Sequence, residues 1–235
     1  TQKAIFGYGA AASKVSLTNL VSSSGVVAAD TTGVGTARGD LAAAGYGSDK
    51  AIFGYGRTGS SLSLTNLVNN SGVVAADVSG VGTARYYLAA AGYGGDKAIF
   101  GYGTTGSYSS LTNLVSSSGV VATDTTGVGT ARGYVAGVSY GGDKALFAYG
   151  YTGSNVSMSN LISNLGVVSA DVTGVGTARG YLAAASYDTD KAIFGYGYNG
   201  SANLSMSNLV SNNGIVASDV SGVGTARRQL GAAGY

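Results

Sequence analysis

The stretch Lys97–Tyr140, KAIFGYGTTGSYSSLTNLVSSSGVVATDTTGVGTARGYVAGVSY, contains the motifs that recur along this chain of 235 residues. The heptapeptide K-A-[IL]-F-[GA]-Y-G begins five times at a spacing of 47 residues, and G-V-G-T-A-R follows each copy. The opening lysines are Lys3, Lys50, Lys97, Lys144 and Lys191, and the closing arginines are Arg38, Arg85, Arg132, Arg179 and Arg227. Periods of roughly 20–50 residues indicate stacked supersecondary units. We therefore expect each period to form one such unit.

Each period consists of short runs separated by turn residues. Leu88–Tyr93 (LAAAGY) and Lys97–Gly103 (KAIFGYG) are apolar runs joined by a glycine turn. Ser109–Val115 alternates more, and Val120–Thr123 (VVAT) follows a Ser/Gly turn. Runs of this length bounded by turn signals are typical of strands, and no segment has a helical period. We expect each repeat to form a four-stranded antiparallel meander.

The apolar runs do not alternate with polar residues, which indicates strands that are covered on both faces. Sheets stacked radially form a β-propeller, which usually has about four to eight blades. The sequence therefore predicts an all-β fold in which residues 1–235 form a single five-bladed β-propeller domain. The chain begins in the second strand of a blade, at Lys3–Gly9, and ends in a first strand, at Leu230–Tyr235. We expect these two strands to pair and close the ring. A β-solenoid, which needs polar caps, is the alternative.

The order of motifs resembles the kelch type of β-propeller repeat. An arginine precedes an apolar run, and then come G-x-D, a run ending in glycines, a loop and two further runs. Lys97–Gly103 stands where kelch blades carry a strand ending in a Gly-Gly pair, although the tryptophan found late in kelch repeats is absent. The sequence motif T-N-L-V-S-x-x-G-V-V, together with D-K-A-I-F-G-Y-G, is similar to tandem repeats in predicted virion or tail proteins of marine bacteriophages. This second resemblance implies a virion or extracellular location.

The composition excludes several classes of function. The chain has no Cys and no His, so it lacks the thiolate and imidazole ligands of zinc, copper and haem sites and an imidazole base. We therefore expect no metal site, no cofactor and no enzymatic activity. The net charge is +2, and there is no polybasic stretch and no long apolar run, so neither nucleic acid nor a membrane is an expected partner.

Most charged residues occupy repeat positions, so a structural role is expected for them. We expect each repeat arginine and each Asp of D-x-x-G to tie a blade to its turns or to its neighbour, with Asp also bonding amides two residues on. An arginine ring that binds an anion is the functional alternative. The Asn of [TS]-N-L is expected to satisfy backbone groups at a bulge or strand end. These asparagines are Asn19, Asn66, Asn113, Asn160 and Asn208.

The copies differ most in the loop after K-A-I-F-G-Y-G and in the pair after the repeat arginine. All seven tyrosines outside repeat positions fall in these two regions. Turns of an antiparallel meander alternate between its two ends, so both regions are expected on one face. Tyr with Ser, Gly and Asn is typical of recognition loops, although drift in tolerant loops is the alternative. The candidate ligand-binding residues are Tyr86, Tyr87, Tyr134, Tyr181, Tyr108, Tyr151, Tyr198, Arg57, Asn155 and Asn199.

These observations predict a non-catalytic binding module. The expected partner is a glycan or cell-surface receptor, or another virion protein, and the expected location is a phage particle or other extracellular assembly. The alternative is a structural or engineered repeat scaffold with no evolved small-molecule ligand, which the near-identity of the copies would also suit.

Overall fold

The computed structural model describes residues 4–234, and these residues form strands and turns without a helix that is long and apolar enough to cross a membrane. The strands are β1 (Ala4–Gly7), β2 (Thr18–Val21), β3 (Ala42–Tyr46), β4 (Lys50–Gly54), β5 (Thr65–Val68), β6 (Ala89–Tyr93), β7 (Lys97–Gly101), β8 (Thr112–Val115), β9 (Ala136–Tyr140), β10 (Lys144–Tyr151), β11 (Asn155–Ile162), β12 (Ala183–Tyr187), β13 (Lys191–Gly195) and β14 (Ser207–Val210). The predicted all-β class is confirmed.

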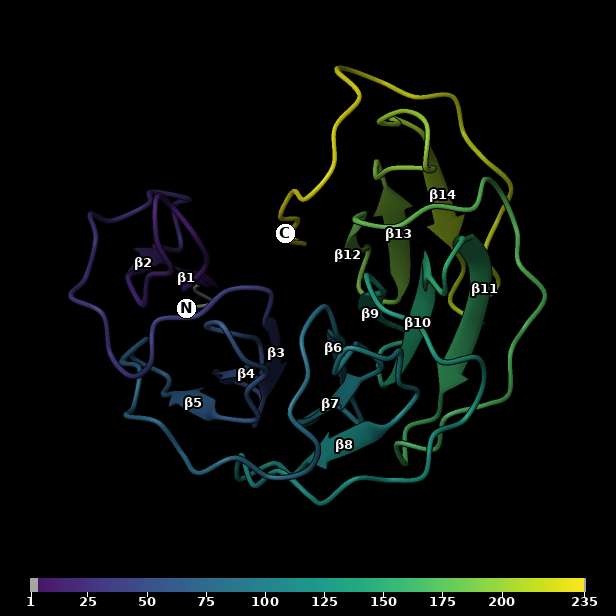
Figure 1. Ribbon diagram of the computed structural model, residues 1–235. Helices are drawn as coiled ribbons and strands as arrows, with labels where there is room; N and C mark the ends of the chain where they lie inside the picture. Colours follow the sequence, from purple (N-terminus) through teal and green to yellow (C-terminus); the bar gives the residue numbers. More distant parts are fainter. Residues whose placement is uncertain (1–3, 235) are drawn as a thin grey trace.

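The repeats fold into five small antiparallel sheets, which we number 1 to 5 along the chain. Sheet 1 contains β1 and β2, and sheets 2 to 5 contain β3-β4-β5, β6-β7-β8, β9-β10-β11 and β12-β13-β14, with the central strand named second in each. Figure 1 shows the five sheets one after another around an arc. The inner strands β3, β6, β9 and β12 contact one another in that order. The predicted repetition of blade-like units is therefore confirmed.

The prediction of four strands in each blade was wrong. In sheet 3 the outer segment, residues 120–125, meets β8 at two isolated bridges, Val115 with Val121 and Thr112 with Thr125. The bridged residues are three apart on β8 and four apart on the outer segment, so a regular ladder is impossible between them. The side-chain amide of Asn113 fills the irregularity by donating to the carbonyl of Ala122 at 3.1 Å. The predicted role of the repeat asparagine is thereby confirmed.

The two chain ends do not pair in the part of the chain that the structure describes. Residues 230–234 form no strand, and sheet 1 has only two strands, so the predicted ladder between Leu230–Tyr235 and Lys3–Gly9 is absent there. Lys3 and Tyr235 lie outside the described residues. Gly234 instead lies against the carbonyl of Ser186 in β12. The C-terminal segment is mostly Gly and Ala, which give a strand little side chain to pack and so favour pairing weakly.

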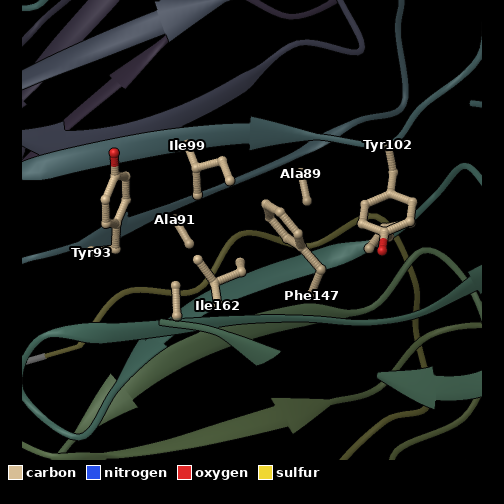
Figure 2. Close-up of a cluster of buried hydrophobic side chains, with 9 residues drawn as sticks. Ala89, Ala91, Tyr93, Ile99, Tyr102, Phe147 and Ile162 are labelled. Atoms are coloured by element: carbon tan, nitrogen blue, oxygen red, sulfur yellow. The ribbon is translucent and has the colours of Figure 1, made fainter. Parts of the chain in front are cut away.

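The hydrophobic core lies between successive sheets. Figure 2 shows Phe147 and Ile162 of sheet 4 facing Ala89, Ala91 and Ile99 of sheet 3, and all five are buried. The small inner-strand alanines leave room for the phenylalanine ring of the next sheet. Because this contact recurs from sheet to sheet, each sheet is stabilised by its neighbours more than by itself.

Polar contacts of each repeat arginine also join neighbouring sheets. Arg132 is fully buried, and its guanidinium lies 4.2 Å over the ring of Tyr102 in sheet 3. Its Nε donates to the carbonyl of Tyr149 at 2.9 Å and its Nη2 to Asn160 Oδ1 at 2.6 Å, both in sheet 4. Arg38, Arg85 and Arg179 make the same contacts. We call this set of contacts an arginine clasp, and it confirms the structural role predicted for the arginines.

The repeat aspartate completes each clasp from the outer segment. Asp171 accepts hydrogen bonds from the backbone amide and hydroxyl of Thr130, at 3.0 and 2.6 Å, and from Asn160 at 2.9 Å. Burial disfavours its charge, yet these hydrogen bonds outweigh burial and lower the pKa of Asp171. The prediction that Asp bonds amides two residues on was wrong for this residue, because its amide partner lies in the preceding repeat.

Candidate binding face

The two variable regions meet on one face of the arc. The residue after each of the first four repeat arginines forms an isolated bridge with the variable region of the next repeat. The bridged pairs are Gly39 with Arg57, Tyr86 with Thr104, Gly133 with Tyr151, and Gly180 with Tyr198. The predicted placement of both regions on a common face is therefore confirmed.

The second residue after each repeat arginine has left-handed backbone geometry. Its φ lies between 53° and 58° in all five copies, although none of the five is a glycine. These residues are Asp40, Tyr87, Tyr134, Tyr181 and Gln229. The amide of Tyr87 donates to the carbonyl of Asp40, that of Tyr134 to Tyr87, and that of Gln229 to Tyr181, at 2.9–3.0 Å. Such geometry is uncommon for non-glycine residues and requires support from the surroundings, which these inter-repeat hydrogen bonds supply.

Three of these residues form a close group of aromatic rings. The ring centroids of Tyr87 and Tyr134 are 4.0 Å apart, and those of Tyr134 and Tyr181 are 4.1 Å apart. Tyr86 adds a fourth ring, 4.8 Å from that of Tyr87. Burial and the neighbouring hydroxyl of Tyr181 raise the pKa of Tyr134. The group presents phenol hydroxyls and aromatic faces together.

One charged pair lies beside these rings. Arg57 Nε donates to Asp40 Oδ2 at 2.7 Å, and Arg57 Nη2 donates to the hydroxyl of Tyr87 at 2.7 Å. The guanidinium lies 4.4 Å over the ring of Tyr86, and Lys14 Nζ is 3.7 Å from the Asp40 carboxylate. We call Tyr86, Tyr87, Tyr134, Tyr181, Arg57 and Asp40 the tyrosine mouth.

A cavity of about 340 Å³ opens within the tyrosine mouth. Each of the five repeats contributes a left-handed residue and the apolar residue after it to the cavity wall. The apolar residues are Leu41, Leu88, Val135, Leu182 and Leu230. A cavity lined by aromatic and aliphatic side chains together with a few polar groups is typical of small-molecule binding sites.

The remaining candidates surround the mouth. The ring of Tyr151 is 6.3 Å from that of Tyr134 and 6.0 Å from that of Tyr108, so both extend the aromatic surface. Asn155 lies beside Gly180. Asn199 differs, because its Oδ1 accepts the amides of Ser201 and Ala202 and so stabilises its own turn.

The last repeat has its own polar arrangement at the edge of this face. The hydroxyl of Tyr198 donates to the carbonyl of Gly200 at 2.7 Å, and Arg228 lies 4.4 Å over the ring of Tyr198. Arg228 is also 5.7 Å from the ring centroid of Tyr181, which links this edge to the mouth.

The candidate residues named from the sequence leave out four polar residues of this face: Asp40, Gln229, Arg228 and Lys14. Asp40 and Gln229 occupy the repeat position of Tyr87, so equivalence between copies was a signal for them. Lys14 had no such signal, because its contact with Asp40 depends on how the first loop folds.

A second cavity, of about 260 Å³, lies at the other end of the inner strands and is lined by residues of the glycine turns. Its lysines have ion-pair partners, as in Lys97 with Asp96 at 3.2 Å. The copies differ little there, so the sequence variation is associated with the tyrosine mouth.

Comparison with known proteins finds no family model and no curated protein that matches this chain.

Proposed function

We propose that this protein is a non-catalytic binding module that recognises a glycan at the tyrosine mouth. The observation that carries the proposal is the convergence of Tyr87, Tyr134 and Tyr181 on one cavity that aliphatic side chains also line. Aromatic faces suit the C–H faces of a sugar ring, while phenol hydroxyls and the Arg57–Asp40 pair offer hydrogen bonds to sugar hydroxyls. The cavity volume suits a single terminal sugar residue better than a long chain.

The proposal includes a propeller-like ring in which five units surround the mouth. Asp40 from the first repeat and Gln229 from the last line the same cavity, which supports this arrangement. Display on a phage particle or other extracellular assembly, with a cell-surface glycan as partner, follows from the resemblance to virion repeats and belongs to the same proposal.

The test compares wild-type protein and mouth variants on a glycan array. Asn tolerates left-handed backbone geometry, so Tyr87→Asn, Tyr134→Asn and Tyr181→Asn remove the rings with little strain. Each ring is worth about 0.5–1.5 kcal/mol beyond its buried area, so each single variant should bind about 2–10-fold more weakly and the triple variant should lose the signal. Tyr187→Ala, at the other end of β12, is the control and should bind normally. An unchanged profile for the triple variant would refute the site.

A structural role is the second candidate, and one observation favours it. The residue after the Ser/Gly turn of every repeat is aliphatic and 61–67% exposed. These residues are Val26, Val73, Val120, Val167 and Ile215. A regular series of exposed aliphatic residues suits contact with another protein of an assembly. A blank glycan array together with ordered oligomers in light scattering would support this candidate.

A further inference from the structure

The arc carries one arginine clasp that is divided between its two ends. Arg227 is exposed, whereas the four clasp arginines are fully buried. Its guanidinium lies 4.0 Å over the ring of Tyr196, and its Nη1 donates to the carbonyl of Thr225 at 3.1 Å. The Nη1 of each clasp arginine likewise donates to the carbonyl of the threonine two residues before it. Sheet 5 therefore presents the donor half of a clasp.

Sheet 1 presents the acceptor half. The amide of Asn19 donates to Asp30 at 2.8 Å and to the carbonyl of Ala28 at 3.1 Å, as Asn66 does with Asp77 and Ala75. In the formed clasp, Asn66 Oδ1 accepts from Arg38 and Asp77 accepts from Thr36. Among the described residues, no arginine or threonine occupies the corresponding positions next to Asn19 and Asp30.

The apolar surfaces at the two ends are also complementary. Four repeat phenylalanines are each at most 4% exposed, and the centroid of each ring lies 5.1–5.6 Å from that of a tyrosine of the preceding sheet. They are Phe53, Phe100, Phe147 and Phe194. Phe6, the equivalent residue of sheet 1, is 55% exposed.

The position that corresponds to Phe6 on sheet 5 is the open space over Gly195. A Cβ at Gly54 or Gly101 would lie 2.5 Å from the phenylalanine of the next sheet, whereas a Cβ at Gly195 would meet nothing within 4 Å. Within residues 4–234, sheet 1, which carries Phe6, has no preceding sheet, and sheet 5, which carries Gly195, has no following sheet. Sheet 5 thus lacks the partner that sheet 1 supplies.

We propose that the two ends of the arc bind each other through a fifth clasp. In it Arg227 donates to Asn19 and to the carbonyl of Tyr8, Thr225 donates to Asp30, and Phe6 packs over Gly195. The two ends belong to one chain, and Asp40 of the first repeat and Gln229 of the last line the same cavity. The effective concentration of one end at the other therefore exceeds the concentration of a second copy of the chain. This contact differs from the expected ladder between terminal strands, because it joins the outer parts of sheets 5 and 1.

Closure has a consequence for the tyrosine mouth, and to this extent the inference rests on the proposed function. In the four formed junctions, the residue after the arginine bridges to the next variable loop. The corresponding pair is Arg228 with Ala10, in the loop that carries Lys14. Closure therefore brings the cation of Arg228 toward Lys14 and Asp40 and completes the rim of the mouth.

The first test measures thermal unfolding of Asp30→Ala and Arg227→Ala, with Asp77→Ala as the matched control in a formed clasp. If the fifth clasp forms, Asp30→Ala lowers Tm about as much as Asp77→Ala, by about 2–6 °C. Asp30→Ala and Arg227→Ala together then lower Tm by less than the sum of the single changes. A fall for Asp77→Ala with none for Asp30→Ala would overturn the proposal.

The second test uses the absence of cysteine from the chain. Thr130 and Asp171 are hydrogen-bonded in a formed clasp, so Thr130→Cys with Asp171→Cys is the matched control for the same pair of positions. Thr225→Cys with Asp30→Cys should form a disulfide within the monomer under mild oxidation, detected by mass and by non-reducing electrophoresis. Disulfide-linked dimers, or no disulfide where the control forms one, would contradict closure within one chain. Neither test uses a ligand, so a blank glycan array would refute the proposed function and leave closure standing.

Discussion

The repeat asparagine shows how much one side chain contributes to this fold. Asn160 is fully buried, accepts from Arg132, and donates to Asp171 and to the carbonyl of Ser169. The sequence predicted its link to the backbone, because a recurrent buried amide needs partners. The sequence did not predict that Asp171 binds Thr130, since that contact spans 41 residues and depends on how two sheets are placed.

Asn160→Ala should therefore destabilise the protein severely. The substitution leaves a buried guanidinium donor and a backbone carbonyl without partners, which costs about 2–4 kcal/mol. The free energy of unfolding in urea measures this effect. Asn213→Ala, at an exposed turn, is the control, and it should change stability by less than about 0.5 kcal/mol. Equal effects of the two substitutions would contradict the role assigned to Asn160.

The raised pKa values of buried tyrosines lead us to expect a lower free energy of unfolding at alkaline pH. Burial raises the pKa of Tyr55 and Tyr102 to about 12, so the folded state holds protons that the unfolded state releases near pH 10. Their contribution is fully present below pH 10 and is lost as the pH rises toward 12. Urea unfolding at pH 8 and pH 11 measures the loss. Tyr102→Phe should reduce this pH dependence, and an unchanged pH dependence would show that Tyr102 is not responsible.

At the level of the structural element, the outer segment of each sheet departs most from the sequence prediction. Alternation and turn residues located the segment correctly, but they gave no sign of the extra residue that prevents a ladder. A few backbone hydrogen bonds and two side chains together hold the segment: the asparagine amide from one side and the aspartate clasp from the other. Strand propensity alone describes such a segment poorly, because its pairing depends on tertiary contacts.

Asp171→Ala should loosen one outer segment and leave the others intact. Without the carboxylate, Thr130 and Asn160 lose their common acceptor, so the amide of Val172, which donates to Ser159, should exchange with solvent about 10-fold faster or more. Hydrogen exchange followed by mass spectrometry measures this change. The equivalent segment around Thr125 is the internal control. Acceleration of both segments together would indicate global rather than local loosening.

At the level of the whole molecule, a chain of nearly neutral clasps links the sheets. Period and composition predicted five all-β units and a variable face, since both depend on local sequence. The ladder predicted between the two chain ends was wrong for the described residues, because the Gly- and Ala-rich C-terminal segment carries few side chains that specify a partner. The left-handed backbone geometry of the mouth residues could not be predicted from the sequence either, since Tyr rarely adopts a positive φ.

The clasps also predict acid sensitivity of the whole molecule. Hydrogen bonds from threonine and asparagine outweigh burial and lower the pKa of four carboxyls, those of Asp77, Asp124, Asp171 and Asp219. A folded pKa below the unfolded value of about 3.9 stabilises the fold above that pH. The contribution is lost as the pH falls through the folded pKa. Urea midpoints should therefore fall between pH 5 and pH 2.5, and Asp77→Asn should make that fall smaller. A midpoint that is constant over this range would contradict the clasp.

Recognition at the tyrosine mouth is tested most directly by NMR of protein labelled in its tyrosine rings, titrated with a sugar selected on the array. The account predicts that signals of Tyr86, Tyr87, Tyr134 and Tyr181 shift together with one dissociation constant, while those of Tyr93 and Tyr140 stay constant. Shifts at Tyr93 and Tyr140, with an unperturbed mouth, would contradict it.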